Sequence, residues 1–270
     1  MADGERVNRI QRLRGRVKDL QAEVRDLKAE LALSRDSVRD VNPDLPLPDD
    51  VRRVVDGVLA DKLTYLTPEN VAALARLVLE TERRALPGLI VEAGTALGGS
   101  AIAMAAAKSP GRPMKVYDVF GMIPEPSERD GVDVQKRYED IAAGRSLGLD
   151  GTTYYGYRED LLGEVTASFT RHGVEPASNN VELVQGLFQD TIHLDEPVAL
   201  AHLDGDWYDS TMVCLERITP LLVPGGRLVL DDYYFWSGCR EATNDYFAHR
   251  SGYRLEHRSK LHVVREPRTG

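Results

Sequence analysis

Short apolar segments alternate with helix-like segments along most of the chain after residue 88. The apolar segments typical of strands are 89–91, 115–120, 181–188, 198–203, 227–231, 253–257 and 261–265. Helical composition and spacing are found between them at 98–107, 209–221 and 239–250. Alternation of this kind lets strands pair in parallel, because each helix returns the chain to the same edge. It predicts an α/β fold with a doubly wound, mostly parallel seven-stranded sheet.

Residues 1–40 differ from the rest of the chain. Their apolar heptad positions are Ile10, Leu13, Val17, Leu20, Val24, Leu27 and Leu31. Mostly β-branched residues at a, with Leu at d, favour a parallel two-stranded coiled coil. We therefore expect a helical coiled-coil arm that makes a homodimer or higher homo-oligomer. The alternative is one amphipathic helix lying on the main domain.

The remaining chain divides by composition. Prolines 43, 46 and 48 mark a linker over 41–49, and the main domain is expected at 50–270. Its first part, 50–86, reads as a helical cap with helices at 50–61 and 68–84. Thr67 is a candidate N-cap, and Pro68 suits the first helical position. The polar segment 121–180 is expected to be a long loop that acts as a substrate lid.

Charge and composition exclude several classes of protein. The net charge is −9, which argues against a nucleic-acid binder. No apolar run approaches the ~18 residues of a membrane span, and the charged N-terminus does not resemble a secretory signal. With Cys214 and Cys239 alone, a disulfide framework and a four-cysteine zinc site are excluded. Reduced thiols and a cytoplasmic location are the expectation.

A glycine-rich run, VEAGTALGGS at 91–100, follows the first strand and opens a helix. Glycines there allow a tight turn and close approach to a ligand, but Ala96 breaks the G-x-G-x-x-G dinucleotide pattern. Asp118 ends the second strand and could bind ribose hydroxyls of either NAD or S-adenosylmethionine. Glu92 could face the amino group of a methionyl moiety. The alternative roles are a helix-terminus or solvent contact for Glu92 and a turn for Asp118. The cofactor-binding candidates in this run are Glu92, Gly94, Thr95, Gly98, Gly99 and Ser100.

The segment 186–191 ends another strand. Phe188 could pack on an adenine ring, and Asp190 could bind a polar edge of the cofactor. The alternative for both is a simple core or capping role.

Acidic residues follow two apolar strands, in HLDGDWYDS at 202–210 and LDDY at 230–233. Clustered carboxylates at buried strand ends imply protonation, an ion pair or a metal. Oxygen ligands without cysteine favour Mg²⁺ first, and Mn²⁺ or Ca²⁺ next. The alternative is that these acids cap the following helices, which is the expectation for Asp209.

The run LDGDWYDSTM, followed by LVLDDYYFWSGCREA, resembles the signature of the macrocin O-methyltransferase family. The segments VEAGTALGGSA, DVFGMIPEP, GLFQDTI and YLTPE also resemble family motifs, so the resemblance covers about residues 60–265. It implies a Rossmann-like class I methyltransferase fold. It also implies transfer of a methyl group from S-adenosylmethionine to a sugar hydroxyl of a natural product, with Mg²⁺.

The resemblance also assigns roles to individual residues. Asp204, Asp231 and Asp232 match metal-binding acids, and Asp204 is in addition the expected general base. Residues matching positions near the cofactor are Glu92, Gly94, Ser100, Asp118 and Asp190, with Thr64 and Tyr65 closing over it. Some relatives have a histidine three positions after the first acid, where this chain has Trp207.

The sequence leaves several alternative residue roles and functions open. His202 competes for the role of base, or is a buried core histidine. A catechol-type O-methyltransferase shares the metal and cofactor with the expected enzyme for a glycosylated acceptor. An NAD-dependent oxidoreductase lacks its glycine motif here, and a coiled-coil scaffold with a vestigial domain would bind no metal. In the lid, two roles are open for the tyrosines, stacking on the acceptor or ordinary packing; they are Tyr154, Tyr155 and Tyr157. A contact with a phosphate of the acceptor is open for Arg129 and Arg137.

Overall fold

The structure, a computed structural model, describes residues 45–267; the predicted arm at 1–40 lies outside them. Seven strands form one sheet in the order β3-β2-β1-β4-β5-β7-β6. They are β1 (Leu89–Ala93), β2 (Met114–Asp118), β3 (Val181–Gln185), β4 (Val198–Leu203), β5 (Leu222–Leu230), β6 (Tyr253–His257) and β7 (Leu261–Arg265). Strands β1 to β5 run parallel, whereas β7 pairs antiparallel with both of its neighbours, β5 and β6. The predicted mostly parallel, seven-stranded sheet is confirmed.

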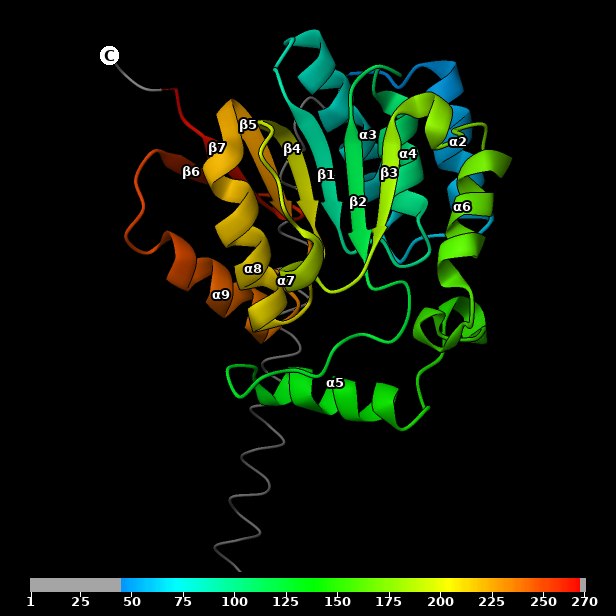
Figure 1. Ribbon diagram of the computed structural model, residues 1–270, viewed down its shortest axis with the longest axis vertical. Helices are drawn as coiled ribbons and strands as arrows, with labels where there is room; N and C mark the ends of the chain where they lie inside the picture. Colours follow the sequence, from blue (N-terminus) through cyan, green and yellow to red (C-terminus); the bar gives the residue numbers. More distant parts are fainter. Residues whose placement is uncertain (1–44, 268–270) are drawn as a thin grey trace, which may run out of the picture.

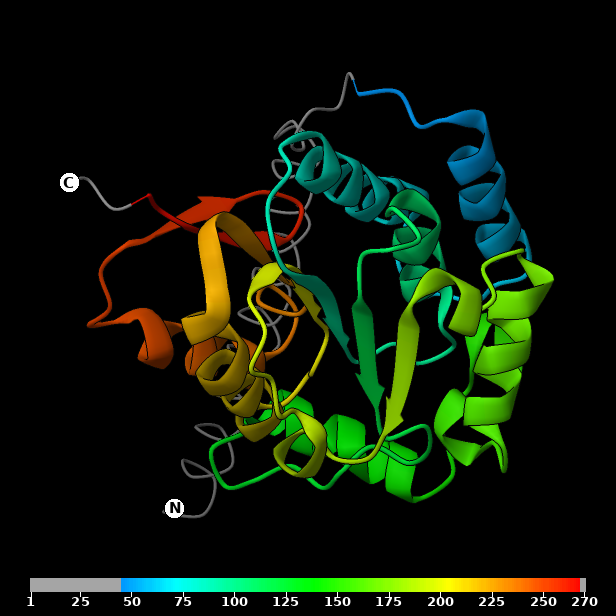
Figure 2. The same ribbon diagram turned by 45° about the horizontal axis from the view of Figure 1, so that its top comes forward.

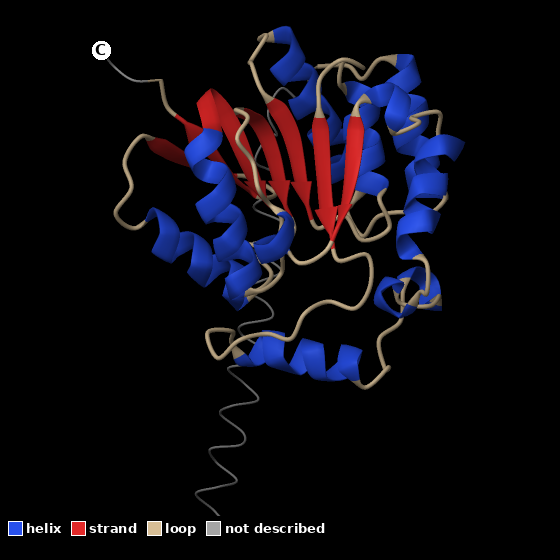
Figure 3. Cartoon of the chain, in the orientation of Figure 1, coloured by secondary structure: helices blue, strands red, loops and turns tan. Residues whose placement is uncertain are grey.

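Helices cover both faces of the sheet (Figures 1 and 3). They are α2 (Asp49–Ala60), α3 (Pro68–Arg83), α4 (Gly99–Ala107), α5 (Val132–Ala142), α6 (Leu161–Arg171), α7 (Phe188–Thr191), α8 (Tyr208–Ile218) and α9 (Ser237–Phe247). One apolar core joins α2, α3, α4 and α6 to the sheet, and a second joins α8 and α9 to its other face. None of the helices in residues 45–267 has the length and apolar character needed to span a bilayer.

Local sequence signals explain where these elements begin and end. Helix α3 begins as predicted, because the Thr67 side chain accepts a hydrogen bond from Asn70 N and Pro68 is its first residue. Strand β3 ends at Gln185, earlier than predicted, because Gly186 has a φ of 141° and the chain then enters α7. Strand β5 begins earlier than predicted, at Leu222. Gly225, with a φ of 80°, and a register shift against β4 carry the strand past its proline.

The lid segment is not the long loop that its polarity suggested. It contains α5, α6 and short 3₁₀ turns, and α5 lies across the carboxyl ends of the parallel strands (Figures 1 and 2). Helix α6 is capped by Asp160, whose side chain accepts a hydrogen bond from Gly163 N. Its buried Leu161, Val165 and Phe169 recur every four residues, which is a helical spacing. The surrounding polar residues hid this pattern.

Backbone hydrogen bonds continue past the carboxyl ends of the central strands. Asp204 N donates to Ala93 O at 2.8 Å, and Asp231 N donates to Leu203 O at 2.9 Å. Asp204 is therefore held beside the end of β1, and Asp231 beside the end of β4. Strands β2 and β4 lie on opposite sides of β1, and such a reversal of strand order creates the crevice in which open α/β sheets bind ligands.

Candidate functional site

A cavity of about 490 Å³ opens at the carboxyl ends of the parallel strands. One side consists of residues that follow β1, β2, β3, β4 and β5. The other consists of residues 64–67 and of lid residues, including Arg137, Tyr154 and Tyr155. A volume of this size is typical of a site for a small molecule or cofactor. The cavity therefore joins the glycine run, the two acidic motifs and the lid.

Gly94 makes the turn that brings the chain from β1 into the cavity wall. Its φ is 89°, a conformation that costs glycine little. A Cβ atom on this residue would lie 1.9 Å from the carbonyl oxygen of Asp204. A side chain at this position would therefore push apart the glycine run and the first acidic motif.

Asp118 supports the glycine run through its side chain. Its Oδ2 accepts hydrogen bonds from Thr95 N at 2.8 Å and Ala96 N at 2.9 Å. Its Oδ1 accepts one from Phe120 N at 2.7 Å. Burial raises the pKa of Asp118, against the effect of these donors. Asp118 was predicted to bind ribose. In the structure its side chain stabilises the glycine run.

Gly98 and Gly99 allow close packing behind the cavity. A Cβ on Gly98, which has a φ of 88°, would lie 2.8 Å from Val165 Cγ1 of α6. A Cβ on Gly99 would lie 2.5 Å from Leu63 O, which accepts the Gly99 N–H at 2.8 Å. These two glycines therefore allow the start of α4 to pack closely against α6 and against Leu63.

The predicted cofactor residues divide into two groups. Those that line the cavity are Thr64, Tyr65, Gly94, Thr95, Ser100, Asp118 and Phe188. Those outside its lining are Glu92, Gly98, Gly99 and Asp190. Glu92 is fully buried and contacts His202, and Asp190 is exposed on α7.

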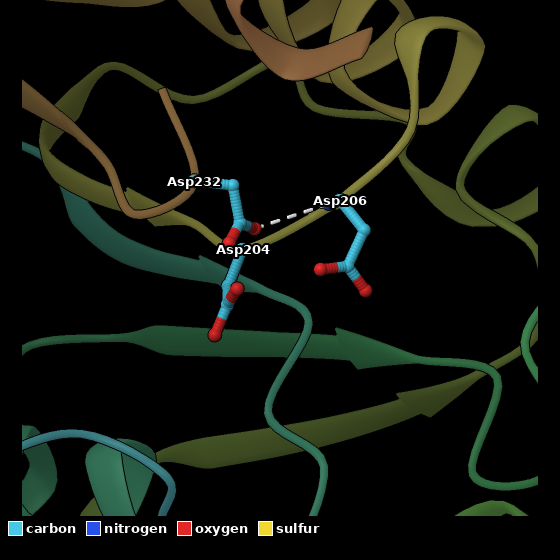
Figure 4. A group of neighbouring side chains, drawn as sticks. All are labelled: Asp204, Asp206 and Asp232. Atoms are coloured by element: carbon cyan, nitrogen blue, oxygen red, sulfur yellow. Dashed lines mark hydrogen bonds between the residues drawn. The ribbon is translucent and has the colours of Figure 1, made fainter. Parts of the chain in front are cut away.

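Three carboxylates converge in the cavity wall (Figure 4). Asp204, Asp206 and Asp232 each offer an oxygen, and these oxygens all lie within 4.8 Å of one another. Asp232 Oδ2 also accepts a hydrogen bond from Asp206 N at 3.2 Å. Burial and the neighbouring carboxylates raise the pKa of Asp204 and Asp206 well above the usual range, and that of Asp232 also rises. Such a group favours a bound cation.

Asp231 makes different contacts from its neighbour in the chain. Its Oδ2 lies 2.5 Å from Lys260 Nζ, and its Oδ1 lies 3.4 Å from His202 Nε2. Burial opposes ionisation, but the charge of Lys260 and the contact with His202 lower the pKa of Asp231 to about 2. Asp231 therefore lines the cavity as one half of an ion pair, outside the three-carboxylate group.

His202 is buried below the acidic residues. Its Nδ1 lies 2.8 Å from Glu92 Oε1, opposite the contact with Asp231. Burial alone would lower the pKa of His202, but the bonds to Asp231 and Glu92 raise it to about 9. As an imidazolium, His202 donates to both carboxylates. This is the arrangement of a buried core histidine and not that of a base lining the cavity.

Aromatic side chains form much of the lid side. Tyr155 packs on Tyr154 with a 4.4 Å centroid separation and on Tyr65 at 6.0 Å. At the acidic end, the Trp207 and Trp236 ring centroids lie 5.9 Å apart. Trp207 therefore fills the position where some relatives are expected to have a histidine.

Sequence reasoning missed two features of the site. Asp206 belongs to the carboxylate group, although only its place in the acidic motif pointed to it. Lys260 reaches the cavity from the β6–β7 hairpin, where nothing in the local sequence marked it. Of the two candidate phosphate-binding arginines, Arg137 lines the cavity, whereas Arg129 pairs with Asp245 at 2.7 Å.

Known proteins resemble this chain in sequence. The model of the family described as macrocin-O-methyltransferase (TylF) matches residues 73–253. A tetracenomycin rhamnosyl 4'-O-methyltransferase from Streptomyces olivaceus is 33% identical over 168 residues, 60% of this chain and 58% of that protein. Mycinamicin III 3''-O-methyltransferase from Micromonospora griseorubida is 37% identical over 87 residues, 32% of this chain and 33% of that protein. The chain thus matches less than two thirds of the length of these relatives.

The fold also resembles that of solved structures. The O-methyltransferase NovP superposes with a TM-score of 0.62 at 23% identity, covering 76% of this chain and 82% of that one. A match of this extent establishes the α/β architecture.

Proposed function

This chain belongs to the macrocin-O-methyltransferase family, and on that basis we propose that it methylates a sugar hydroxyl of a glycosylated natural product, using S-adenosylmethionine and Mg²⁺. One observation carries the proposal. The glycine turn at Gly94 and the carboxylates of Asp204, Asp206 and Asp232 line one cavity. The names of two similar proteins, a rhamnosyl 4'-O-methyltransferase and a mycinamicin 3''-O-methyltransferase, favour this acceptor class.

The cofactor end has room for a nucleoside and a methionyl chain. Gly94 and Ser100 leave an open wall at the start of α4, and Asp118 keeps that wall rigid. Phe188 offers an apolar face for the adenine, and Thr64 and Tyr65 lie across the cavity. S-adenosylmethionine would supply an activated methyl group, so these residues have to align it and exclude water.

The acidic end has a donor set that suits Mg²⁺. Asp204, Asp206 and Asp232 offer hard oxygen ligands, and a divalent ion would relieve their mutual repulsion. Asp231 remains a predicted ligand, although its Oδ2 pairs with Lys260 in this structure. The ion would lower the pKa of an acceptor hydroxyl and orient it.

Proton removal falls to the same group of carboxylates. Asp204 lines the cavity and belongs to the group that would hold the ion, so its carboxylate would stand beside the acceptor hydroxyl. We assign it the role of general base. His202 is already bound to two carboxylates, so it has no lone pair to accept the proton.

The test is methyl transfer from labelled S-adenosylmethionine to a panel of deoxysugar glycosides and to a catechol. Product is expected with the glycosides in Mg²⁺ and none in EDTA. Equal labelling in EDTA would contradict the role of the metal. Labelling of the catechol alone would replace the sugar acceptor with the catechol-type alternative.

We also propose that residues 1–40 associate two copies of the chain through their heptad positions. Sedimentation equilibrium of the full chain and of a chain lacking residues 1–40 tests this. A dimer that becomes a monomer supports the proposal, and an unchanged mass contradicts it.

A further inference from the structure

Arg137 differs from the other arginines of the lid. The segment 121–180, which the structure describes completely, contains five arginines. Four of them lie within 4.0 Å of a carboxylate, in the pairs Arg129–Asp245, Arg145–Asp140, Arg158–Glu164 and Arg171–Asp61. No such partner is found for Arg137 among the described residues. It is also the arginine of this group that lines the cavity.

Two contacts hold the Arg137 side chain in place. Its Nη1 donates a hydrogen bond to Ser146 Oγ at 3.0 Å, and its guanidinium carbon lies 5.6 Å from the centroid of the Tyr154 ring. Ser146 and Tyr154 are both buried. A guanidinium has five N–H donors, and the Ser146 contact uses one. The group is thus oriented by the lid while most of its donors remain available to a ligand.

The charge of Arg137 reaches into the cavity. It opposes the rise in pKa of Tyr65 and of Tyr154, which line the same cavity. The other lining cation, Lys260, is already neutralised by Asp231. Among the described lining residues, Arg137 is therefore the cation that has no carboxylate within 4.0 Å.

We propose that Arg137 is an anion-binding residue that fixes a carboxylate or phosphate group of a bound ligand. The inference rests on the proposed function, because the ligand has to be the cofactor or the acceptor. The anion has two sources: the methionyl carboxylate of S-adenosylmethionine or an acidic group on the acceptor. A planar guanidinium suits either, because it can bind two oxygens at once.

The test compares charged and uncharged ligands by calorimetric titration of the full chain. S-adenosylhomocysteine carries the methionyl carboxylate, and 5'-methylthioadenosine lacks the whole amino-acid portion. If the cofactor is the source, Arg137→Met weakens S-adenosylhomocysteine by about 10- to 100-fold and 5'-methylthioadenosine by less than about twofold. Arg137→Lys keeps the positive charge but loses the planar guanidinium. Its affinity for S-adenosylhomocysteine is expected to lie between those of the parent and of Arg137→Met.

A second pair of ligands tests the acceptor. Glucose 1-phosphate and glucose are titrated into protein saturated with S-adenosylhomocysteine. If the acceptor is the source of the anion, Arg137→Met weakens the binding of glucose 1-phosphate but not that of glucose, and S-adenosylhomocysteine binds as before. The control is Arg145→Met, which removes an exposed arginine paired with Asp140 near the same helix and is expected to change neither series.

The remaining outcomes overturn the proposal. Equal weakening of charged and uncharged ligands would mean that Arg137 only holds the lid together. No weakening in either series would mean that it binds no anion. Failure of the unmodified chain to bind S-adenosylhomocysteine would instead contradict the proposed function, so the two failures are distinct.

Discussion

Lys260 Nζ lies 2.5 Å from Asp231 Oδ2 and 3.2 Å from the Asp231 carbonyl oxygen. Asp232, the next residue, contributes to the three-carboxylate group instead. Two adjacent aspartates therefore have opposite electrostatic surroundings. The pKa of Asp231 falls to about 2 because Lys260 outweighs burial, whereas burial and Asp231 raise the pKa of Asp232.

The ion pair gives a first prediction. Lys260→Met leaves the buried Asp231 carboxylate with His202 as its remaining partner. Because an unpaired buried charge is costly, we expect the free energy of unfolding to fall by about 3 kcal/mol. Urea denaturation measures this. The double variant Asp231→Asn/Lys260→Met is expected to lose less than the single one, and an additive loss would show that the pair is not coupled.

The carboxylate group gives a second prediction. Asp206 has a φ of 55°, which asparagine also tolerates, so Asp206→Asn keeps the backbone unstrained. Without metal this variant is expected to be more stable than the parent, since it removes one of three repelling carboxylates. Its Mg²⁺ affinity is expected to fall by at least about tenfold.

Thermal unfolding in EDTA and across a Mg²⁺ titration measures both effects. Asp209→Asn is the matched control, because Asp209 is an exposed acid of the same motif that lies outside the group. It is expected to retain the full Mg²⁺ dependence. Equal Mg²⁺ dependence in both variants would exclude Asp206 from the cation site.

A buried histidine gives a third prediction. Arg227 Nη1 donates to His262 Nδ1 at 3.0 Å, and burial with the nearby arginines lowers the pKa of His262 to about 3. Below the unfolded value of about 6.5, the unfolded chain binds a proton that the folded chain does not. Stability is therefore lost as the pH falls from about 6.5 towards 3, by about 2 kcal/mol at about pH 5.

Denaturation curves at about pH 7 and about pH 5 are compared with those of His262→Gln. The glutamine oxygen can accept the Arg227 N–H but does not titrate in this range. The difference in stability between the two proteins is expected to shrink or reverse at the lower pH. A constant difference would show that His262 is not held neutral.

The glycine turn gives a fourth prediction. Gly94→Ala places a Cβ 1.9 Å from Asp204 O and is expected to abolish binding of S-adenosylhomocysteine. Gly173→Ala is the control, because Gly173 has a similarly positive φ of 74° and no atom within 4 Å of its added Cβ. Calorimetry separates the two effects. If both variants bind equally well, the close approach of Gly94 to Asp204 has no role in binding.

Strand–helix alternation was enough to predict the sheet, because apolar strands in an α/β fold are local features of the sequence. Bounds were wrong where backbone conformation overrides composition, as at Gly186 and Gly225. Helix α5 was missed because its buried residues, Val134 and Ile141, lie among charged ones. Helix α6 has a regular helical spacing of buried residues and was missed because the segment around it is polar.

The acidic site could be located from sequence but not resolved into roles. Asp231 and Asp232 lie in a bend after Leu230, the last residue of β5, so strand alternation does not decide which partners each carboxylate faces. The difference between them depends on Lys260, which pairs with Asp231 from 29 positions away in sequence. Asp206 joins the group through a left-handed turn that spacing alone does not reveal.

The most direct test of the central claim is calorimetric titration of S-adenosylmethionine into the purified chain, with NAD⁺ as the control ligand. The account predicts saturable binding of S-adenosylmethionine at one site per chain, little changed by EDTA because the metal serves the acceptor, and no heat from NAD⁺. Absence of S-adenosylmethionine binding, or preference for NAD⁺, would contradict the assignment of the cavity to a methyl donor.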